Sequence, residues 1–192
     1  MAEFERDLLS KGVPSFLADH SVEHPPLTHP LIHFERKHIG TRNDEKHMRF
    51  DTWVHERSPP EGDLILQMDI EGAEYVVILD TDYRTLERFR IIVVEFHFLD
   101  RLFDRFAGKV ISEVFTKLCK SFVVVHIHPN NRCGSIQSGG IEIPACMEFT
   151  FLRADRVRQI KPATVFPHPL DRHNVNGFPE IKLPGCWYRD RP

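Results

Sequence analysis

Carboxylates follow a short apolar segment near the middle of the chain. Asp69 and Glu71 lie two positions apart, and Gly72 and Glu74 come soon after them. On an extended segment this spacing points both carboxylates to the same side, and Gly72 permits a sharp turn into a following helix. The pair could therefore line a ligand or catalytic site. A plainer interpretation is that the acidic residues cap the helix and hold the loop, because the first turn of a helix favours anions such as Glu74.

Histidines occur at the ends of two later apolar segments. His97 follows Glu95 at the same two-residue spacing, so it could act as a general base near neutral pH. The same two residues could equally be a structural pair at the sheet edge. His126 and His128 share one face of a strand, and with the central carboxylates nearby they could ligate a metal ion. The plainer interpretation is that the backbone and solvent satisfy them, since the chain has 12 histidines.

Alternating patterns in the central half of the chain predict the elements that must position these side chains. Short apolar runs predict buried strands, and longer segments with apolar residues at helical spacing predict helices. The predicted strands are residues 63–70, 91–96, 122–128 and 146–153, and the predicted helices are residues 73–89, interrupted near 80–82, and 99–120. This alternation favours an α/β fold with a mostly parallel sheet and a C-terminal antiparallel hairpin.

The patterns at the two ends of the chain are weaker. Residues 4–11 predict the end of a helix, residues 13–18 and 31–36 predict strands, and residues 129–141 predict a loop. Residues 161–192 are rich in Pro, His and Asn and have little periodicity. They predict an irregular tail behind a domain of residues 1–160.

The carboxyl ends of the predicted strands carry further polar residues. In an open parallel sheet, ligands bind beyond these ends. This rule adds Asp19, His38 and Gly40 to the candidates, together with Asn130 and Asn131. Several carboxylates and imidazoles therefore converge on one edge of the expected sheet, which is the main functional signal in the sequence.

The composition is that of one globular domain. The chain has 192 residues, of which 41% are hydrophobic and 28% are charged, and its formal net charge is -3. This charge gives no electrostatic reason to expect nucleic acid or an anionic membrane as a partner. The four cysteines have no C-x-x-C spacing and no secretory segment is visible, which predicts reduced thiols and a cytoplasmic location. No apolar run approaches the ~18 residues of a transmembrane helix.

Several of these segments together resemble a known family. Residues 64–75, Leu-Ile-Leu-Gln-Met-Asp-Ile-Glu-Gly-Ala-Glu-Tyr, follow Phe-Asp-Thr-Trp-Val at residues 50–54. They resemble the core of FkbM-type S-adenosylmethionine-dependent methyltransferases, in which an "lDd" element precedes a strand ending in K-D-x-E-G-A-E. Gln67 stands where the family usually has a basic residue. The neighbouring strands and the terminal hairpin of the family are similar to residues 16–22, 93–97, 125–131 and 144–153. The resemblance therefore covers roughly residues 4–155.

The resemblance implies a Rossmann-like class I methyltransferase sheet with S-adenosyl-L-methionine as the cofactor. In such enzymes the acidic residue that ends the second strand binds the cofactor ribose, which implies Asp19 here. The residues implied to line the cofactor and substrate cleft are Ile39, Gly40, Asp69 and Glu71. Nothing like the Gly-rich turn of the family's first strand lies upstream of Asp19. We therefore expect an N-terminally truncated sheet that lacks this strand.

Residues and resemblance together predict O-methylation of a small-molecule or glycan hydroxyl. His97 would act as the base, oriented by Glu95, with Glu71 also in the catalytic set and no metal required. A first alternative is a metal-dependent hydrolase or transferase that uses Asp69, Glu71, His126 and His128. A second alternative is a non-catalytic remnant that binds a partner through an open sheet edge. The methyl acceptor and the oligomeric state stay open.

Overall fold

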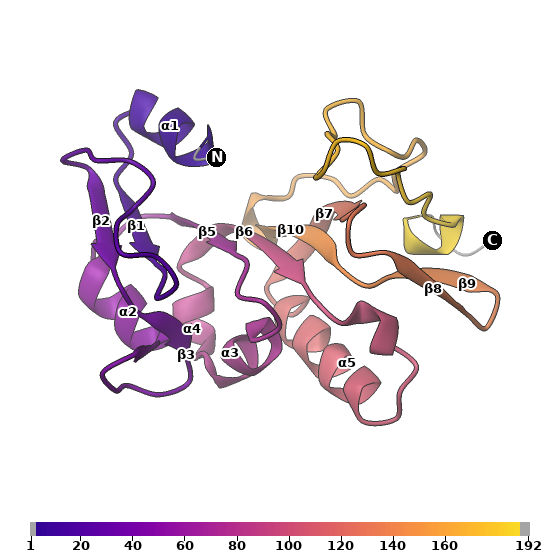
Figure 1. The fold of residues 1–192 in the computed structure, drawn as a ribbon, viewed down its shortest axis with the longest axis horizontal. Coiled ribbons are helices and arrows are strands. Elements are labelled where there is room, and N and C mark those ends of the chain that lie inside the picture. The colour runs from indigo at the N-terminus through magenta and orange to yellow at the C-terminus, as the bar shows by residue number, and fades with distance from the viewer. Residues whose placement is uncertain (1–2, 189–192) are drawn as a thin grey trace. The chain divides into compact units, whose positions relative to one another are not determined.

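The chain forms two compact units in the computed structural model, which describes residues 3–188 (Figure 1). The first unit extends to Gly62 and also includes Asp80–Thr85. The second unit comprises Asp63–Leu79 and the chain from Leu86 onward. The domain boundary expected at residue 160 stays a prediction.

The first unit contains two small parallel sheets. Its elements are α1 (Glu3–Ser10), β1 (Ser15–Ala18), β2 (Ile32–Glu35), β3 (His38–Gly40), β4 (His47–Arg49) and α2 (Phe50–Arg57). β1 pairs with β2, and β3 pairs with β4. Met48, Phe50 and Val54 are buried where β4 passes into α2. The strands predicted at 13–18 and 31–36 are confirmed, whereas β3 and β4 are too short to give a pattern.

A four-stranded sheet forms the centre of the second unit. Its strands are β5 (Leu64–Met68), β6 (Phe89–Phe96), β10 (Met147–Arg153) and β7 (Phe122–Pro129), in that order across the sheet. β5, β6 and β7 run in one direction, and β10 runs against both of its neighbours. This confirms a mixed α/β fold with a mostly parallel sheet. The Rossmann-like class and the absent first strand stay predictions.

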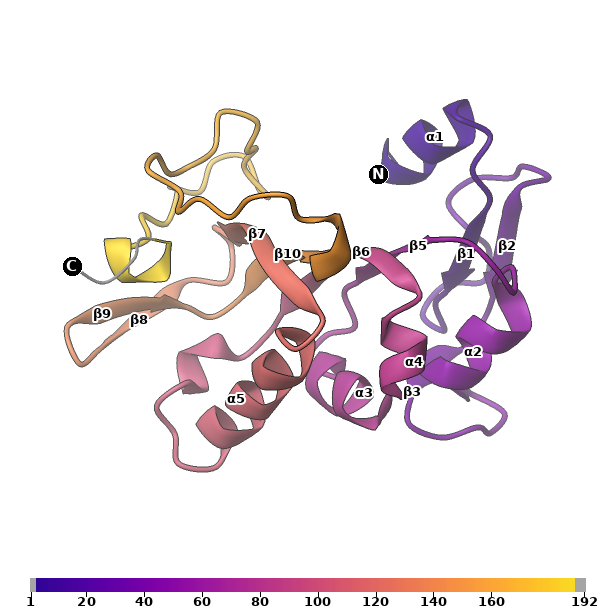
Figure 2. The same ribbon diagram turned by 180° about the vertical axis from the view of Figure 1, so that it is seen from behind.

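One face of this sheet carries the apolar core. Alternate strand residues are buried there, namely Leu66, Met68, Ile92, Val94, Phe96, Phe149 and Phe151. The Phe96 ring centroid lies 5.0 Å from that of Phe115 and 5.7 Å from that of Phe149. α3 (Glu74–Asp80) and α5 (Ala107–Leu118) lie on one side of the sheet, and the C-terminal segment lies on the other (Figure 2). The polar strand residues therefore face away from the helices.

The helical segments are shorter than the sequence predicts. Residues 73–89 split into α3 and α4 (Tyr83–Leu86), and this confirms the predicted interruption. Within residues 99–120 only α5 is an α-helix, preceded by the 3-10 turn η1 (Leu99–Arg101). None of the helices within residues 3–188 is long and apolar enough to cross a membrane.

The predicted loop at 129–141 contains a strand of a hairpin. β8 (Ser135–Ser138) pairs antiparallel with β9 (Ile141–Pro144). Gly139 and Gly140 between them have φ angles of 58° and 78°, as the commonest two-residue hairpin turn requires. Since both strands are short and β8 is mostly polar, apolar periodicity does not reveal them.

The C-terminal segment after β10 is mostly irregular, as predicted. Among its described residues the only regular elements are two 3-10 turns, η2 (Ala154–Arg156) and η3 (Gly185–Trp187). The Asn131 side chain, which follows β7, donates hydrogen bonds to the backbone carbonyls of Val175 and Phe178 at 3.0 and 3.1 Å. These contacts hold the segment against the end of β7.

Candidate functional site

The turn between β5 and α3 is organised by the carboxylate of Glu74. This side chain is fully buried, and its Oε1 accepts hydrogen bonds from the backbone N–H groups of Ile70 (3.0 Å) and Gly72 (3.1 Å). Glu71 has a φ of 55° and Gly72 a φ of 101°. A Cβ at Gly72 would lie 2.4 Å from the ring of Phe98. Glu74 thus holds a turn that only glycine accommodates easily at its sharpest point.

His97 follows β6 and meets three carboxylates of this turn. Its Nδ1 lies 3.1 Å from Oε1 of Glu74. Its Nε2 lies 3.4 Å from Glu71 and 3.8 Å from Asp69. The Tyr75 hydroxyl donates a 2.6 Å hydrogen bond to the His97 carbonyl, and the imidazole is only 12% exposed. The ring is therefore held from both its backbone and its Nδ1 side, and Nε2 points toward the other two carboxylates.

Asp69 lies in an environment that disfavours its charge. Burial, followed by repulsion from the Glu95 carboxylate, raises the pKa of Asp69 from 3.8 to about 6, although attraction to His97 acts against this. Repulsion from Glu71 and Glu74 acts in the same direction as burial. The carboxyl group can therefore exchange a proton close to neutral pH.

Glu95 does not make the expected contact with His97 in the described part of the chain. Its Oε1 instead accepts a 2.6 Å hydrogen bond from the Asn130 side chain, which follows β7. The carboxylate that orients the imidazole is Glu74. The two-residue spacing of Glu95 and His97 predicts a shared strand face, but β6 ends at Phe96 and the backbone of Phe98 turns into the left-handed region with a φ of 59°.

His126 and His128 contact the C-terminal segment. His126 Nε2 lies 2.9 Å from Asp171, and Nδ1 of the buried His128 lies 3.6 Å from the same carboxylate. They line a pocket of about 620 Å³ with Glu148 and His168. The four-residue metal set of the first alternative is not brought together among residues 3–188. Two other groups there place their donor atoms within 4.8 Å of one another: Asp69, Glu71 and His97, and Glu95, Cys133 and Cys146.

Asp19 follows β1 in the first unit, as the sequence predicts. Its Oδ1 accepts hydrogen bonds from both the backbone N–H and the hydroxyl of Ser21, each at 2.7 Å. A carboxylate offers about four acceptor positions. Asp19 is thus able to accept further hydrogen bonds from a ligand hydroxyl.

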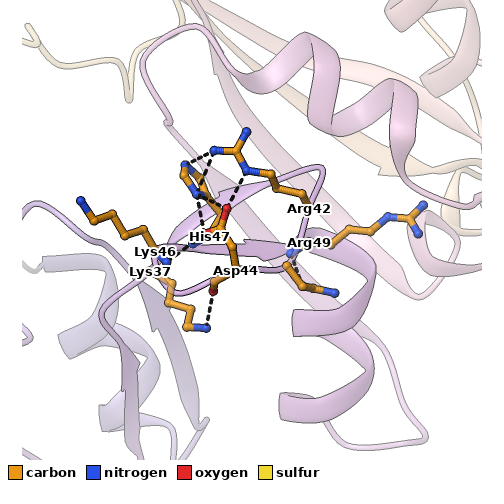
Figure 3. Close-up of polar contacts among 7 residues, drawn as sticks. Lys37, Arg42, Asp44, Lys46, His47 and Arg49 are labelled. Atoms are coloured by element: carbon orange, nitrogen blue, oxygen red, sulfur yellow. Dashed lines mark hydrogen bonds and ion pairs between the residues drawn. The ribbon is translucent and has the colours of Figure 1, made fainter.

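Ile39 and Gly40 lie in β3, directly before a loop held by Asp44 (Figure 3). The Asp44 carboxylate accepts a 2.7 Å hydrogen bond from Arg42 Nε and lies 2.8 Å from His47 Nδ1. These partners hold the pKa of Asp44 well below its usual range. The loop after β3 therefore has a defined shape, and the binding role of Ile39 and Gly40 stays a prediction.

Some residues of the site escape sequence analysis. Glu74 stands in the D-x-E-G-A-E motif, but its motif position indicates a helix start and not a contact with His97. Asn130 is a candidate only because it ends a strand, and nothing in the sequence indicates its bond to Glu95. Asp171 lies in a segment without periodicity, so its approach to the His126 ring carries no sequence signal.

Comparison with known proteins adds one match. The model of a family described as "Methyltransferase FkbM domain" matches residues 10–129. Neither the curated proteins nor the solved structures include a match to the chain. The matched residues run from the end of α1 through β7 and include Asp19, the turn after β5 and His97. Since the match spans more than half of the sequence, the chain belongs to the FkbM methyltransferase domain family.

Proposed function

We propose that this methyltransferase domain transfers a methyl group from S-adenosyl-L-methionine to a hydroxyl of a small molecule or glycan. The observation that carries the proposal is the His97 imidazole, with Nδ1 against the buried Glu74 carboxylate and Nε2 directed at Asp69 and Glu71. Transfer to a hydroxyl oxygen requires alignment of the reactants and removal of one proton. An oriented imidazole supplies the second requirement.

In the proposed reaction His97 takes the hydroxyl proton on Nε2. A hydrogen on Nδ1, donated to Glu74, leaves Nε2 with its lone pair, so the ring can act as a base. The imidazolium that forms lies beside a fully buried carboxylate. Its positive charge is stabilised more strongly there than in water. Glu71 and Asp69 lie on the Nε2 side of the ring, where their carboxylates can accept hydrogen bonds from hydroxyl groups of the substrate.

The cofactor supplies the methyl group as an electrophile. Asp19 fits the chemistry of its ribose, since the carboxylate keeps acceptor capacity beyond the two bonds from Ser21. Ile39, Gly40 and Asp69 complete the proposed cofactor-binding set. Their role rests on the family resemblance.

Replacement of His97 tests the proposal. His97→Ala is expected to lower turnover at least ~100-fold, the usual contribution of a general base, while the affinity for S-adenosylmethionine measured by calorimetry stays within a factor of about two. Turnover is followed as release of S-adenosylhomocysteine with a panel of phenols and sugars. His24→Ala removes an exposed histidine of the first unit and is the matched control. Unchanged turnover in His97→Ala would remove this residue from the mechanism.

A metal-assisted reaction is the second candidate. It is favoured by one observation, the grouping of Asp69, Glu71 and His97 donor atoms within 4.8 Å of one another. A divalent cation there would take Nε2 as a ligand, so His97 could not act as the base. Elemental analysis of protein purified without chelators distinguishes the metal-assisted reaction from general-base catalysis by His97. One bound zinc or manganese per chain favours the metal-assisted reaction.

A further inference from the structure

Two cysteines lie opposite each other at the base of the β8–β9 hairpin. The strand register pairs Ser135 with Pro144, and Ala145 N–H donates a 2.9 Å hydrogen bond to the Gly134 carbonyl. Cys133 and Cys146 are the next residues outward on the two segments. The 12 residues between them in the sequence hide this relation from any spacing rule.

The position within the ladder brings the two thiols together. Antiparallel pairs alternate between hydrogen-bonded and non-hydrogen-bonded, and the side chains of the second kind are closer. Gly134 and Ala145 form a hydrogen-bonded pair. Cys133 and Cys146 therefore leave the hairpin on facing segments, as a cross-strand disulfide requires.

The side chains confirm this proximity. The two sulfur atoms lie within 4.8 Å of each other and of a Glu95 carboxylate oxygen. Cys146 is buried and Cys133 is exposed. Burial and then a hydrogen bond with the Cys133 thiol raise the pKa of Cys146. One thiol is thus open to solvent reagents, and the other is protected until its neighbour reacts.

The geometry points to a modification site: Cys133 and Cys146 form a cross-strand disulfide when the protein meets hydrogen peroxide. The Cys133 sulfur attacks a peroxide oxygen, the O–O bond breaks, and Cys133 becomes a sulfenic acid as one water leaves. The Cys146 sulfur then attacks that of Cys133, and the sulfenic hydroxyl leaves with the Cys146 proton as a second water. The thiols lose two electrons and two protons, which reduce the peroxide.

The disulfide would fix the segment after β9, which also contacts residues near the candidate functional site. The Cys146 carbonyl accepts a 3.0 Å hydrogen bond from the N–H of Asn130, and the Ala145 carbonyl accepts one of 2.9 Å from Leu99. Asn130 in turn holds Glu95. The disulfide would close a short loop around the hairpin and reduce the freedom of the unfolded chain. It depends on neither the proposed reaction nor its cofactor.

The test uses the full chain, reduced and then treated with hydrogen peroxide. Trypsin cleaves after Arg132 and Arg153, so both thiols stay on the single peptide 133–153. After oxidation and alkylation, mass spectrometry is expected to show this peptide lighter by two hydrogens and unlabelled, with labelling restored by reductant. Oxidation is also expected to raise the melting temperature by about 5 °C.

Matched variants separate this pair from the other thiols. Cys133→Ser and Cys146→Ser should each abolish both the mass change and the thermal shift. Cys119→Ser and Cys186→Ser, which alter exposed cysteines elsewhere, should abolish neither. The proposal is overturned if Cys133 proceeds to a sulfinic acid while Cys146 stays alkylatable, or if Cys133 links to another copy of the chain. It is also overturned if bound zinc, with Glu95 as third ligand, protects both thiols from peroxide.

Discussion

The buried carboxylate of Glu74 joins two requirements of the site in one side chain. Its Oε1 holds the turn through two backbone N–H groups and lies against the imidazole of His97. Its Oε2 is buried without a hydrogen-bond partner, so the group relies on Oε1 contacts to offset its desolvation. The burial of Glu74 is therefore better explained by its positioning of the turn and of the His97 ring than by a contribution to stability.

The motif containing these residues could be predicted from sequence, but its contacts could not. Spacing alone places Asp69 and Glu71 on one side of a strand end, and they do meet at His97. The partner of His97 could not be predicted, because Glu74 and His97 lie 23 residues apart. Which carboxylate reaches the ring depends on how the chain continues after β6 ends at Phe96, and periodicity carries no information on that.

The pKa of Asp69 predicts a pH dependence of stability. Because this pKa is about 6 in the folded protein and near its ordinary 3.8 when unfolded, the folded state retains a proton that the unfolded state releases. Stability should therefore fall as pH rises from about 4 to 6. Since the Asp69 side chain is 43% exposed, solvent screening reduces the effect to roughly 1 kcal/mol.

Asp69→Asn removes this titration. In urea unfolding at pH 4.5 and pH 7, wild type should lose roughly 1 kcal/mol more stability than the variant as pH rises. The difference arises because the amide is neutral at both pH values, whereas the Asp69 carboxyl of the folded protein is neutral at pH 4.5 and charged at pH 7. Equal losses in the two proteins would show that Asp69 titrates alike in its folded and unfolded states.

At the scale of elements, apolar patterns predicted the strands of the central sheet but not the hairpin beside it. β5, β6 and β10 follow from runs whose alternate residues are buried, and β7 follows from a continuous apolar run. The β8–β9 hairpin lacks such a pattern, since backbone pairing and the positive φ angles of two glycines define it. The helix predicted at residues 99–120 is also too long, because the chain forms turns before α5 begins at Ala107. At the start of α5 the backbone carbonyl of Leu102 comes close to Gly108.

This approach predicts the effect of a substitution at Gly108. A Cβ at this position would lie 2.2 Å from the backbone carbonyl oxygen of Leu102, which cannot rotate away as a side chain would. Gly108→Ala should therefore lower the free energy of unfolding by about 2 kcal/mol, even though alanine favours helices. Lys109→Ala alters an exposed residue of the same turn and should change stability by less than about 0.5 kcal/mol. A stabilised Gly108→Ala protein in denaturant unfolding would contradict the steric argument.

At the scale of the whole molecule, the chain passes between its two units three times. It leaves the first unit after Gly62, returns for Asp80–Thr85, and leaves again at Leu86. In the first unit Arg49 Nε donates a 2.7 Å hydrogen bond to the Asp80 carboxylate. Sequence length and composition carry no information on how contacts are divided between the two units, and the single domain that they indicate stays a prediction.

Two core substitutions should show whether the units respond separately. Phe50 in the first unit is 2% exposed and Phe96 in the second is fully buried, so replacing either with alanine should cost about 3–5 kcal/mol. In hydrogen exchange followed by mass spectrometry, Phe50→Ala should speed exchange mainly in β1–β4 and α2. Phe96→Ala should act mainly on β5, β6, β7 and β10. These patterns are expected because local opening follows the contacts that each ring loses. Uniform acceleration along the whole chain in both variants would show one cooperative structure.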